Sequence, residues 1–120
     1  GVATPISTGL MSARYRAVDT SRSRYVNGVM IQPWHPFTAS SAQPVVPGKP
    51  MLVPVEVFPN AAVIRAGHKL RVAISASNQA QGVWPLPNQA NANGNTTVIL
   101  NSAEYPSSVV LPVVPTNALN

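Results

Sequence analysis

The sequence predicts an all-β domain, built as a sandwich or a barrel, and three observations lead to this prediction. Apolar residues alternate with a period of two almost wherever a period can be read, which is typical of strands with one buried face. Thirteen prolines and seven glycines divide the chain into short segments and disfavour long helices. A chain of 120 residues is long enough for one core and too short for two, so residues 1–120 are expected to form a single domain.

The first two strand candidates differ in how clearly their pattern can be read. Residues 9–18 fit a helix or a strand, and we favour a strand. Residues 51–58 form a clearer strand, with Pro54 and Glu56 on the outward face, and a proline there fits an edge strand. The residues expected on the inward face are Met51, Val53, Val55 and Val57.

The middle of the chain predicts two strands joined by a tight turn. Residues 60–64 read as a short strand and residues 65–68 as the turn after it. Residues 69–77 show the cleanest alternation in the chain, and the outward residues include Lys69 and Arg71. The residues expected to face inward are Leu70, Val72, Ile74 and Ala76.

Two segments rich in β-branched residues are the last strand candidates, and the segments between the candidates are expected to be loops. Residues 95–101 and 107–115 are rich in valine, isoleucine and threonine, which favour strands. Segments 19–28, 33–50 and 78–94 are expected to be loops, because proline, glycine and small polar residues dominate them.

The low charge of the chain narrows the classes of partner. Only 9% of the residues are charged, against about a quarter in an average soluble domain, so either serine, threonine, asparagine and glutamine form the polar surface or a partner covers part of it. The net charge of +5 comes from scarce acids, and a nucleic-acid site usually adds more basic residues and interleaved aromatics to a cluster such as the arginines at positions 14, 16, 22 and 24. We therefore expect no nucleic-acid partner. No apolar run reaches the ~18 residues of a membrane span, and we expect no membrane partner.

Nothing in the sequence predicts catalysis or a metal or cofactor site in this chain. There is no G-x-S-x-G nucleophile elbow, and no cysteine is present for a thiolate site. The only acids are Asp19, Glu56 and Glu104, and neither His35 nor His68 has a neighbouring ligand at metal-binding spacing. His68 instead follows Gly67, so we interpret it as the last residue of a tight turn.

Aromatic residues on two loops are the candidates for contact with a ligand or a partner. Trp34 and His35 lie in the sequence "QPWHPF", and Trp84 lies in "GVWPLPN". Such residues can line a pocket, fill an interface or cap the end of a sandwich, and the last two roles are commoner for large aromatics. Tyr105 precedes Pro106 and is expected to anchor a turn through its hydroxyl group.

Three segments together carry a resemblance to a known family. They are "STGLMSARYR" at 7–16, "LVPVEVFPNAAVIRAGHKLRVAISAS" at 52–77 and "NGNTTVILNSAEYPSSVVLPVVP" at 93–115. In order and spacing the chain resembles the C-terminal β-sandwich domain of the X-prolyl dipeptidyl-peptidase and cocaine-esterase family of α/β-hydrolases. Ile64 stands where the family's second motif usually has an aromatic residue.

The resemblance implies a fold and a supporting role. The family's domain is a jelly-roll-type, galactose-binding-like β-sandwich, and its first strands have no counterpart here, which implies an incomplete N-terminal side. The catalytic serine, aspartate and histidine of the family lie in the α/β-hydrolase domain, and no position here matches them. The implied function is therefore a non-catalytic domain of a serine dipeptidyl-peptidase or esterase, which packs on the hydrolase domain of the same protein or of a companion chain.

Two other functions fit a sandwich of this composition, because one fold hosts many functions. A carbohydrate-binding module is the first alternative, and it would use Trp34 and Trp84 as a sugar platform. A viral coat jelly roll is the second, suggested by the proline, threonine and asparagine content, but the chain lacks the basic arm that packages nucleic acid.

Overall fold

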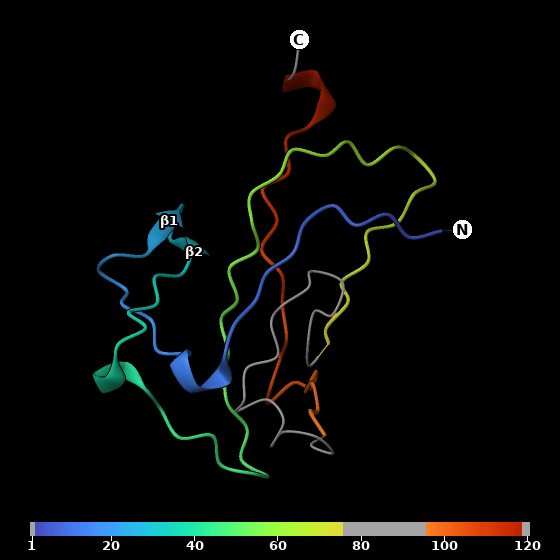
Figure 1. The fold of residues 1–120 in the computed structure, drawn as a ribbon. Coiled ribbons are helices and arrows are strands. Elements are labelled where there is room, and N and C mark those ends of the chain that lie inside the picture. The colour runs from blue at the N-terminus through green and yellow to red at the C-terminus, as the bar shows by residue number, and fades with distance from the viewer. Residues whose placement is uncertain (1, 76–95, 119–120) are drawn as a thin grey trace. The chain divides into compact units, whose positions relative to one another are not determined.

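The computed structural model of the chain describes residues 2–75 and 96–118 (Figure 1). The elements within these residues are three single 3-10 turns and two short strands: η1 (Ala13–Tyr15), β1 (Arg24–Val26), β2 (Val29–Gln32), η2 (Ala39–Ser41) and η4 (Thr116–Ala118). The described residues contain no α-helix, and the rest of them are irregular or extended. This content agrees with the all-β prediction at the level of fold class.

The described residues belong to two compact units. One unit contains residues 2–62 and 108–118, and the other contains residues 63–75 and 96–107. All the helical turns and both strands belong to the first unit.

Strands β1 and β2 form an antiparallel hairpin in a segment that the sequence analysis assigned in part to a loop. Val26 pairs with Val29, and the two residues between them, Asn27 and Gly28, have positive φ values of 49° and 78°. Positive φ at both central residues is the geometry of a type I′ turn, whose twist matches that of the flanking strands. The prediction of a loop at residues 19–28 was therefore wrong for β1.

The prediction of a strand at residues 9–18 is also wrong at the centre of this segment, where η1 forms. The Tyr15 amide donates to the Ser12 carbonyl at 2.9 Å and closes one 3-10 turn. The Arg16 guanidinium then donates to the carbonyl of Ala13 at 2.8 Å. This side-chain bond ties Arg16 to the last turn of η1.

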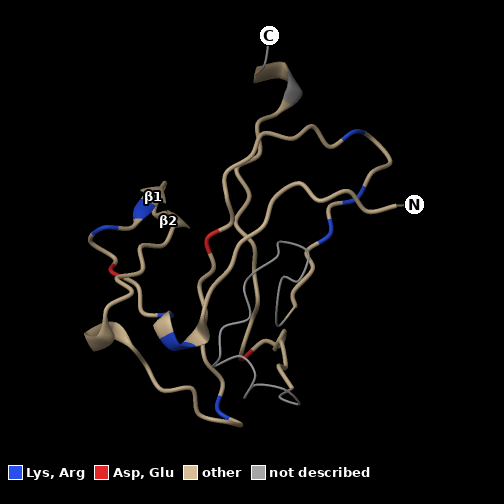
Figure 2. Ribbon diagram, in the orientation of Figure 1, with Lys and Arg blue, Asp and Glu red and all other residues tan. Residues whose placement is uncertain are grey.

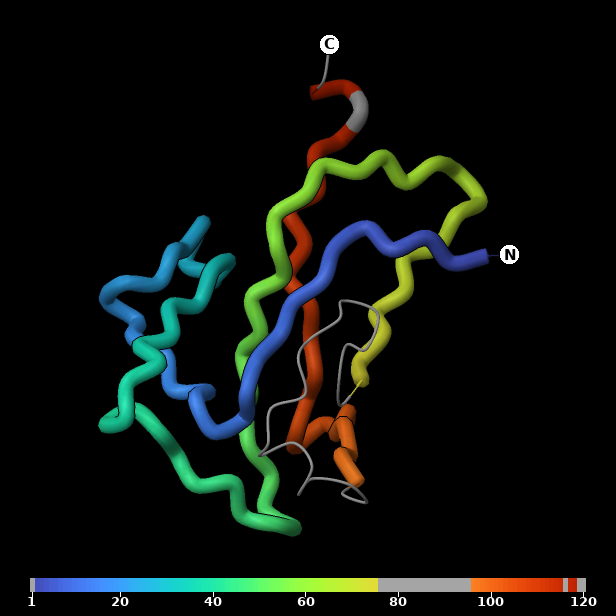
Figure 3. Tube along the Cα trace, in the orientation of Figure 1, coloured from blue at the N-terminus to red at the C-terminus, as the bar shows by residue number. Residues whose placement is uncertain are grey.

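Residues 6–9 run antiparallel to residues 56–60 in the first unit (Figure 3). The Phe58 amide donates to the Thr8 carbonyl at 3.1 Å, and the Asn60 side-chain amide donates to the Ile6 carbonyl at 2.6 Å. A Cβ atom at Gly9 would overlap the Glu56 carbonyl oxygen, so the two backbones approach too closely for any other residue. This pairing brings the predicted strand at residues 51–58 beside residues 6–9, of which only Gly9 belongs to a predicted strand.

The side of residues 51–58 that was expected to face inward is only partly covered. Met51 and Val53 are half-buried, but Val55 and Val57 are exposed. Glu56, expected to face outward, is half-buried instead, because the Gln32 side-chain amide of β2 donates to its carboxylate at 2.6 Å. The expected facing is therefore wrong in the second half of this segment.

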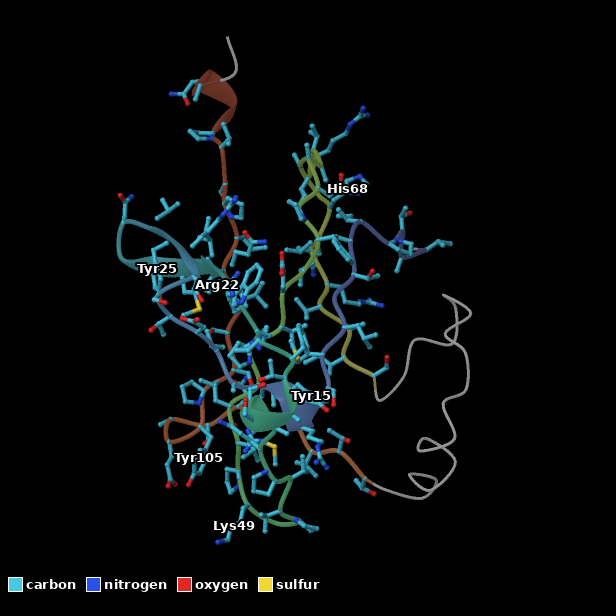
Figure 4. All side chains as sticks on the ribbon, turned by 60° about the vertical axis from the view of Figure 1, so that its left-hand side comes forward. Tyr15, Arg22, Tyr25, Lys49, His68 and Tyr105 are labelled. Carbon is cyan, nitrogen blue, oxygen red and sulfur yellow. The ribbon has the colours of Figure 1, made fainter. Side chains whose placement is uncertain are left out.

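The second unit contains the predicted turn around His68. The His68 amide donates to the Arg65 carbonyl at 3.1 Å, and Gly67 has a φ of 81°. A positive φ at the third residue of a four-residue turn is typical of type II and favours glycine. The interpretation of His68 as the residue that closes the turn is confirmed, and Figure 4 labels it there.

Within the described residues, the turn at Tyr105 is held by hydrogen bonds of the Tyr105 backbone. The Tyr105 amide donates to the Ser102 hydroxyl at 3.1 Å, and the Tyr105 carbonyl accepts from the Ser102 amide at 3.2 Å. The Ser107 hydroxyl then donates to the Leu100 carbonyl at 2.6 Å. The anchor through the Tyr105 hydroxyl group stays a prediction.

No hydrophobic side chain is buried within the described residues. The alternating run of residues 69–75 shows this most clearly, because Val72 is 58% exposed and Ile74 is 63% exposed. The prediction that these residues face a core is wrong for the isolated chain. The apolar alternation is present, but the surface that would cover it is not supplied by the described residues.

Candidate functional site

The candidate site lies on the first unit, where the hairpin meets the segment that follows β2. Trp34 and His35 come directly after Gln32 and Pro33, so the end of β2 places both rings beside the hairpin. The Trp34 amide donates to the Ser23 hydroxyl at 2.9 Å, and the Trp34 carbonyl accepts from the Asp19 amide at 2.9 Å. These bonds fix the backbone of this segment against the loop that leads into β1.

The aspartate loop before β1 is organised by a single carboxylate. One oxygen of Asp19 accepts from the Ser21 hydroxyl at 2.6 Å and from the Ser21 amide at 3.0 Å. The Asp19 carbonyl accepts from the Ser23 hydroxyl at 2.8 Å. The Ser21 hydroxyl bond is the main cause that lowers the pKa of Asp19 below its ordinary value of 3.8, and the nearby Arg22 charge acts in the same direction.

We predict that this loop loses order in acid. A carboxyl group whose pKa is lowered by folding stabilises the folded state above its unfolded pKa and loses that contribution as the pH falls through the lowered value. An NMR titration of Asp19 should therefore give a midpoint below 3.8. Ser21→Ala should move the midpoint upward, whereas Ser40→Ala, in η2, should not; equal midpoints in all three proteins would contradict the assignment.

Trp34 is covered on one face by an arginine. The guanidinium carbon of Arg22 lies 4.1 Å from the centre of the Trp34 ring, a cation–π contact. Figure 4 labels Arg22 beside the hairpin. Because a sugar platform requires a free aromatic face, this contact disfavours the carbohydrate-binding alternative at that face. Trp84, the other tryptophan of that hypothesis, lies outside the described residues.

His35 is the one buried polar residue among the described residues, with 7% of its surface exposed. Its Nδ1 atom lies 3.0 Å from the Ala17 carbonyl oxygen, and because a carbonyl only accepts, Nδ1 carries the proton. Nε2 is buried and has no hydrogen-bond partner in the described part of the chain. The ring also contacts Phe37, with the two centroids 5.7 Å apart.

Phe37 holds an unusual backbone conformation beside His35. Its φ of 52° lies in the left-handed region, which is rare for a bulky residue. The centre of the Phe37 ring lies 6.2 Å from that of Tyr15 in η1, in addition to the contact with His35. These two aromatic contacts help to keep a strained residue in place.

Two adjoining clefts surround these residues. One is an open cleft of about 360 Å³ lined by Arg22, Arg24, Gln32 and Trp34. The other, of about 420 Å³, is mainly apolar and is lined by Leu10, Met11, Gln32, Pro33, Trp34, His35, Pro36, Phe37, Glu56 and Phe58. Trp34 and Gln32 belong to both clefts, so the two form one continuous surface with a basic end and an apolar end.

The sequence analysis found Trp34 and His35, and it named Arg22 and Arg24 only as members of an arginine cluster. It did not predict that these arginines and Gln32 lie beside the tryptophan, because this depends on the pairing of β1 with β2 and on the loop before β1. The Asn27-Gly28 dipeptide between apolar runs was the signal that could have predicted this pairing.

Nothing in the described residues has the arrangement of a metal site or of a membrane-crossing helix. No group of three or more histidine, cysteine, aspartate or glutamate side chains comes together among them. None of the helical turns in the described ranges is long and apolar enough to cross a membrane. The candidate site itself is lined by two guanidinium groups at its basic end and by mainly apolar side chains at the other end.

Comparison with known protein families gives one match, which covers residues 1–110. The matching family is described as the X-Pro dipeptidyl-peptidase C-terminal non-catalytic domain. The comparison with curated proteins and the comparison with solved structures each found no significant match. Because the family match spans all but ten of the 120 residues, this chain belongs to the family of X-Pro dipeptidyl-peptidase C-terminal non-catalytic domains.

Proposed function

We propose that this chain is the non-catalytic β-sandwich domain of a serine acyl hydrolase of the X-Pro dipeptidyl-peptidase or acyl-esterase type. Its role is to pack on the α/β-hydrolase domain and support it. The jelly-roll arrangement, the place of residues 1–120 as the C-terminal part of a larger hydrolase and the companion catalytic domain are all parts of this proposal.

One observation carries the proposal: the described residues bury no hydrophobic side chain, although several of their segments show strand-like apolar alternation. Exposed apolar area on this scale is uncommon in a monomer and marks a surface that another protein element covers. A domain that completes its core against a neighbour would leave this pattern when it stands alone. The family description, which is that of a non-catalytic domain of a peptidase, supports the same role.

Trp34 and His35 belong to this proposal as residues of the interface. Trp34 is 42% exposed and stands between the basic and the apolar cleft. Tryptophan is enriched among the residues that contribute most to binding at protein interfaces. Its position beside two arginines therefore suits contact with another protein domain better than it suits catalysis.

We predict that the 120-residue chain alone does not hydrolyse X-Pro p-nitroanilides or short acyl esters. The reason is that acyl transfer needs a nucleophile, a base and an orienting acid in contact, and these are expected in the hydrolase domain. Steady-state assays of the chain and of the intact peptidase at equal molar concentration test this. Turnover by the chain that a serine-directed inhibitor abolishes would contradict the proposal.

A further inference from the structure

The basic cleft on the hairpin is built so that two arginines face the same open space. Arg24 of β1 stands opposite Gln32 of β2 in the strand register, and Arg22 and Trp34 complete the lining. Figure 2 shows the basic residues on β1 and in the loop before it. Because the cleft is open, a side chain from another protein domain can enter it.

The contact with Trp34 orients the Arg22 guanidinium in advance. The guanidinium carbon lies 4.1 Å from the centre of the indole ring, so the ring restricts the positions that this side chain takes. Restricting the group before binding reduces the conformational entropy that binding would cost. An arginine can donate two parallel hydrogen bonds to one carboxylate.

None of the residues that line the basic cleft carries a carboxylate. Asp19, the nearest acid along the chain, accepts hydrogen bonds from Ser21, and the charge of Arg22 helps to lower its pKa. The Glu56 carboxylate accepts a hydrogen bond from Gln32. The cleft therefore presents two guanidinium groups to the open space, and Asp19 acts only on Arg22, from outside the lining.

We propose that this cleft receives an aspartate or glutamate side chain of the α/β-hydrolase domain. An apolar side chain next to that carboxylate then lies in the adjoining apolar cleft. This inference rests on the proposed packing of the two domains and names the chemistry of the contact. Carboxylates accept bidentate bonds from arginine, and such charge-assisted bonds are about twice as strong as neutral ones. The apolar cleft is lined by side chains that include Leu10, Met11 and Phe58, and such a lining favours binding of a protein segment over binding of a nucleic acid.

Chemical cross-linking in the intact peptidase tests the contact. In an Arg24→Lys variant, a carbodiimide should join the new amine to a carboxylate that touches it, and mass spectrometry should identify an aspartate or glutamate of the hydrolase domain. The matched control is Arg65→Lys, on the exposed turn of the second unit, which should give no such link. High salt should reduce the yield, because screening weakens an exposed ion pair.

A second measurement separates this inference from the proposed packing. Hydrogen exchange of residues 69–75 in the intact peptidase reports whether the apolar segment is covered, and Arg22→Gln with Arg24→Gln should speed exchange at the hairpin about tenfold relative to wild type. Protection of residues 69–75 without a cross-link from position 24 would overturn the carboxylate contact alone. Absence of both would overturn the packing as well.

A nucleic-acid ligand would give a different result. Binding of a single-stranded oligonucleotide to the peptidase, lost in the variant with Arg22→Gln and Arg24→Gln, would assign the cleft to phosphate and overturn the inference. We expect no such binding at physiological salt.

Discussion

Replacing Val72 and Ile74 together with serine should destabilise the intact peptidase by about 2–4 kcal/mol. Full burial of one aliphatic side chain contributes about 1.5–3 kcal/mol, and roughly six tenths of each side chain is exposed in the isolated chain. If a neighbouring element covers both residues in the whole protein, the substitutions remove that contribution. Urea unfolding of the intact peptidase measures the change.

The control for this prediction comes from the opposite face of the same segment. Arg71 and Ala73 alternate with the apolar pair and were expected to face outward. Ala73→Ser should change the free energy of unfolding by less than about 0.5 kcal/mol, as is usual for surface substitutions. Equal effects of the two variants, or no effect of the Val72 and Ile74 pair, would show that no neighbour covers this face.

Gly9→Ala should break the pairing between residues 6–9 and 56–60. A Cβ atom there would overlap the Glu56 carbonyl oxygen and would lie 3.1 Å from a methyl carbon of Val55, so the backbones would have to separate. Forcing extra atoms into a tight contact costs about 1–3 kcal/mol. The Phe58 amide, which donates to the Thr8 carbonyl, should then exchange with solvent at least about fivefold faster.

Ser12→Ala is the matched control for this substitution. Ser12 lies on the same segment as Gly9 and its side chain makes no capping hydrogen bond to η1. Its replacement should leave the exchange rate of the Phe58 amide unchanged. If Gly9→Ala also leaves this rate unchanged, the close approach of the two backbones is wrong.

Local sequence signals predicted the structure correctly where a single turn sets the backbone conformation. The Arg65–His68 turn needed only a glycine that accepts a positive φ, and Gly67 supplies it. The same reasoning would have predicted the hairpin at Asn27 and Gly28, whose dipeptide is a strong hairpin signal. The polar residues before it concealed that signal, and the segment was interpreted as a loop.

The strands were harder to predict because a strand needs a partner that the local sequence does not specify. Residues 69–75 have the right alternation, but they form no ladder among the described residues and remain exposed. Alternation sets which side chains share a face, whereas pairing depends on segments far away in the chain or on another domain. Glu56 shows the same limit, because only the position of Gln32 on β2 decided which way it faces.

The candidate site could be predicted only in part for the same reason. Trp34 and His35 stood out as aromatic residues in a proline-rich segment. The arginines that complete the basic cleft come together through the register of the hairpin, and one of them, Arg22, lies in the loop before it. The membership of the family came from several motifs spread over most of the chain.

Urea unfolding of the isolated 120-residue chain tests the central claim most directly, since the claim is that this domain completes its core against the hydrolase domain. Monitored by circular dichroism and by sedimentation, the isolated chain should show a broad, non-cooperative transition, and adding the hydrolase domain should make the transition cooperative. A cooperative transition of the monomeric chain alone, with an m-value of about 1–3 kcal/mol/M, would show that the chain forms its own core and would contradict the account.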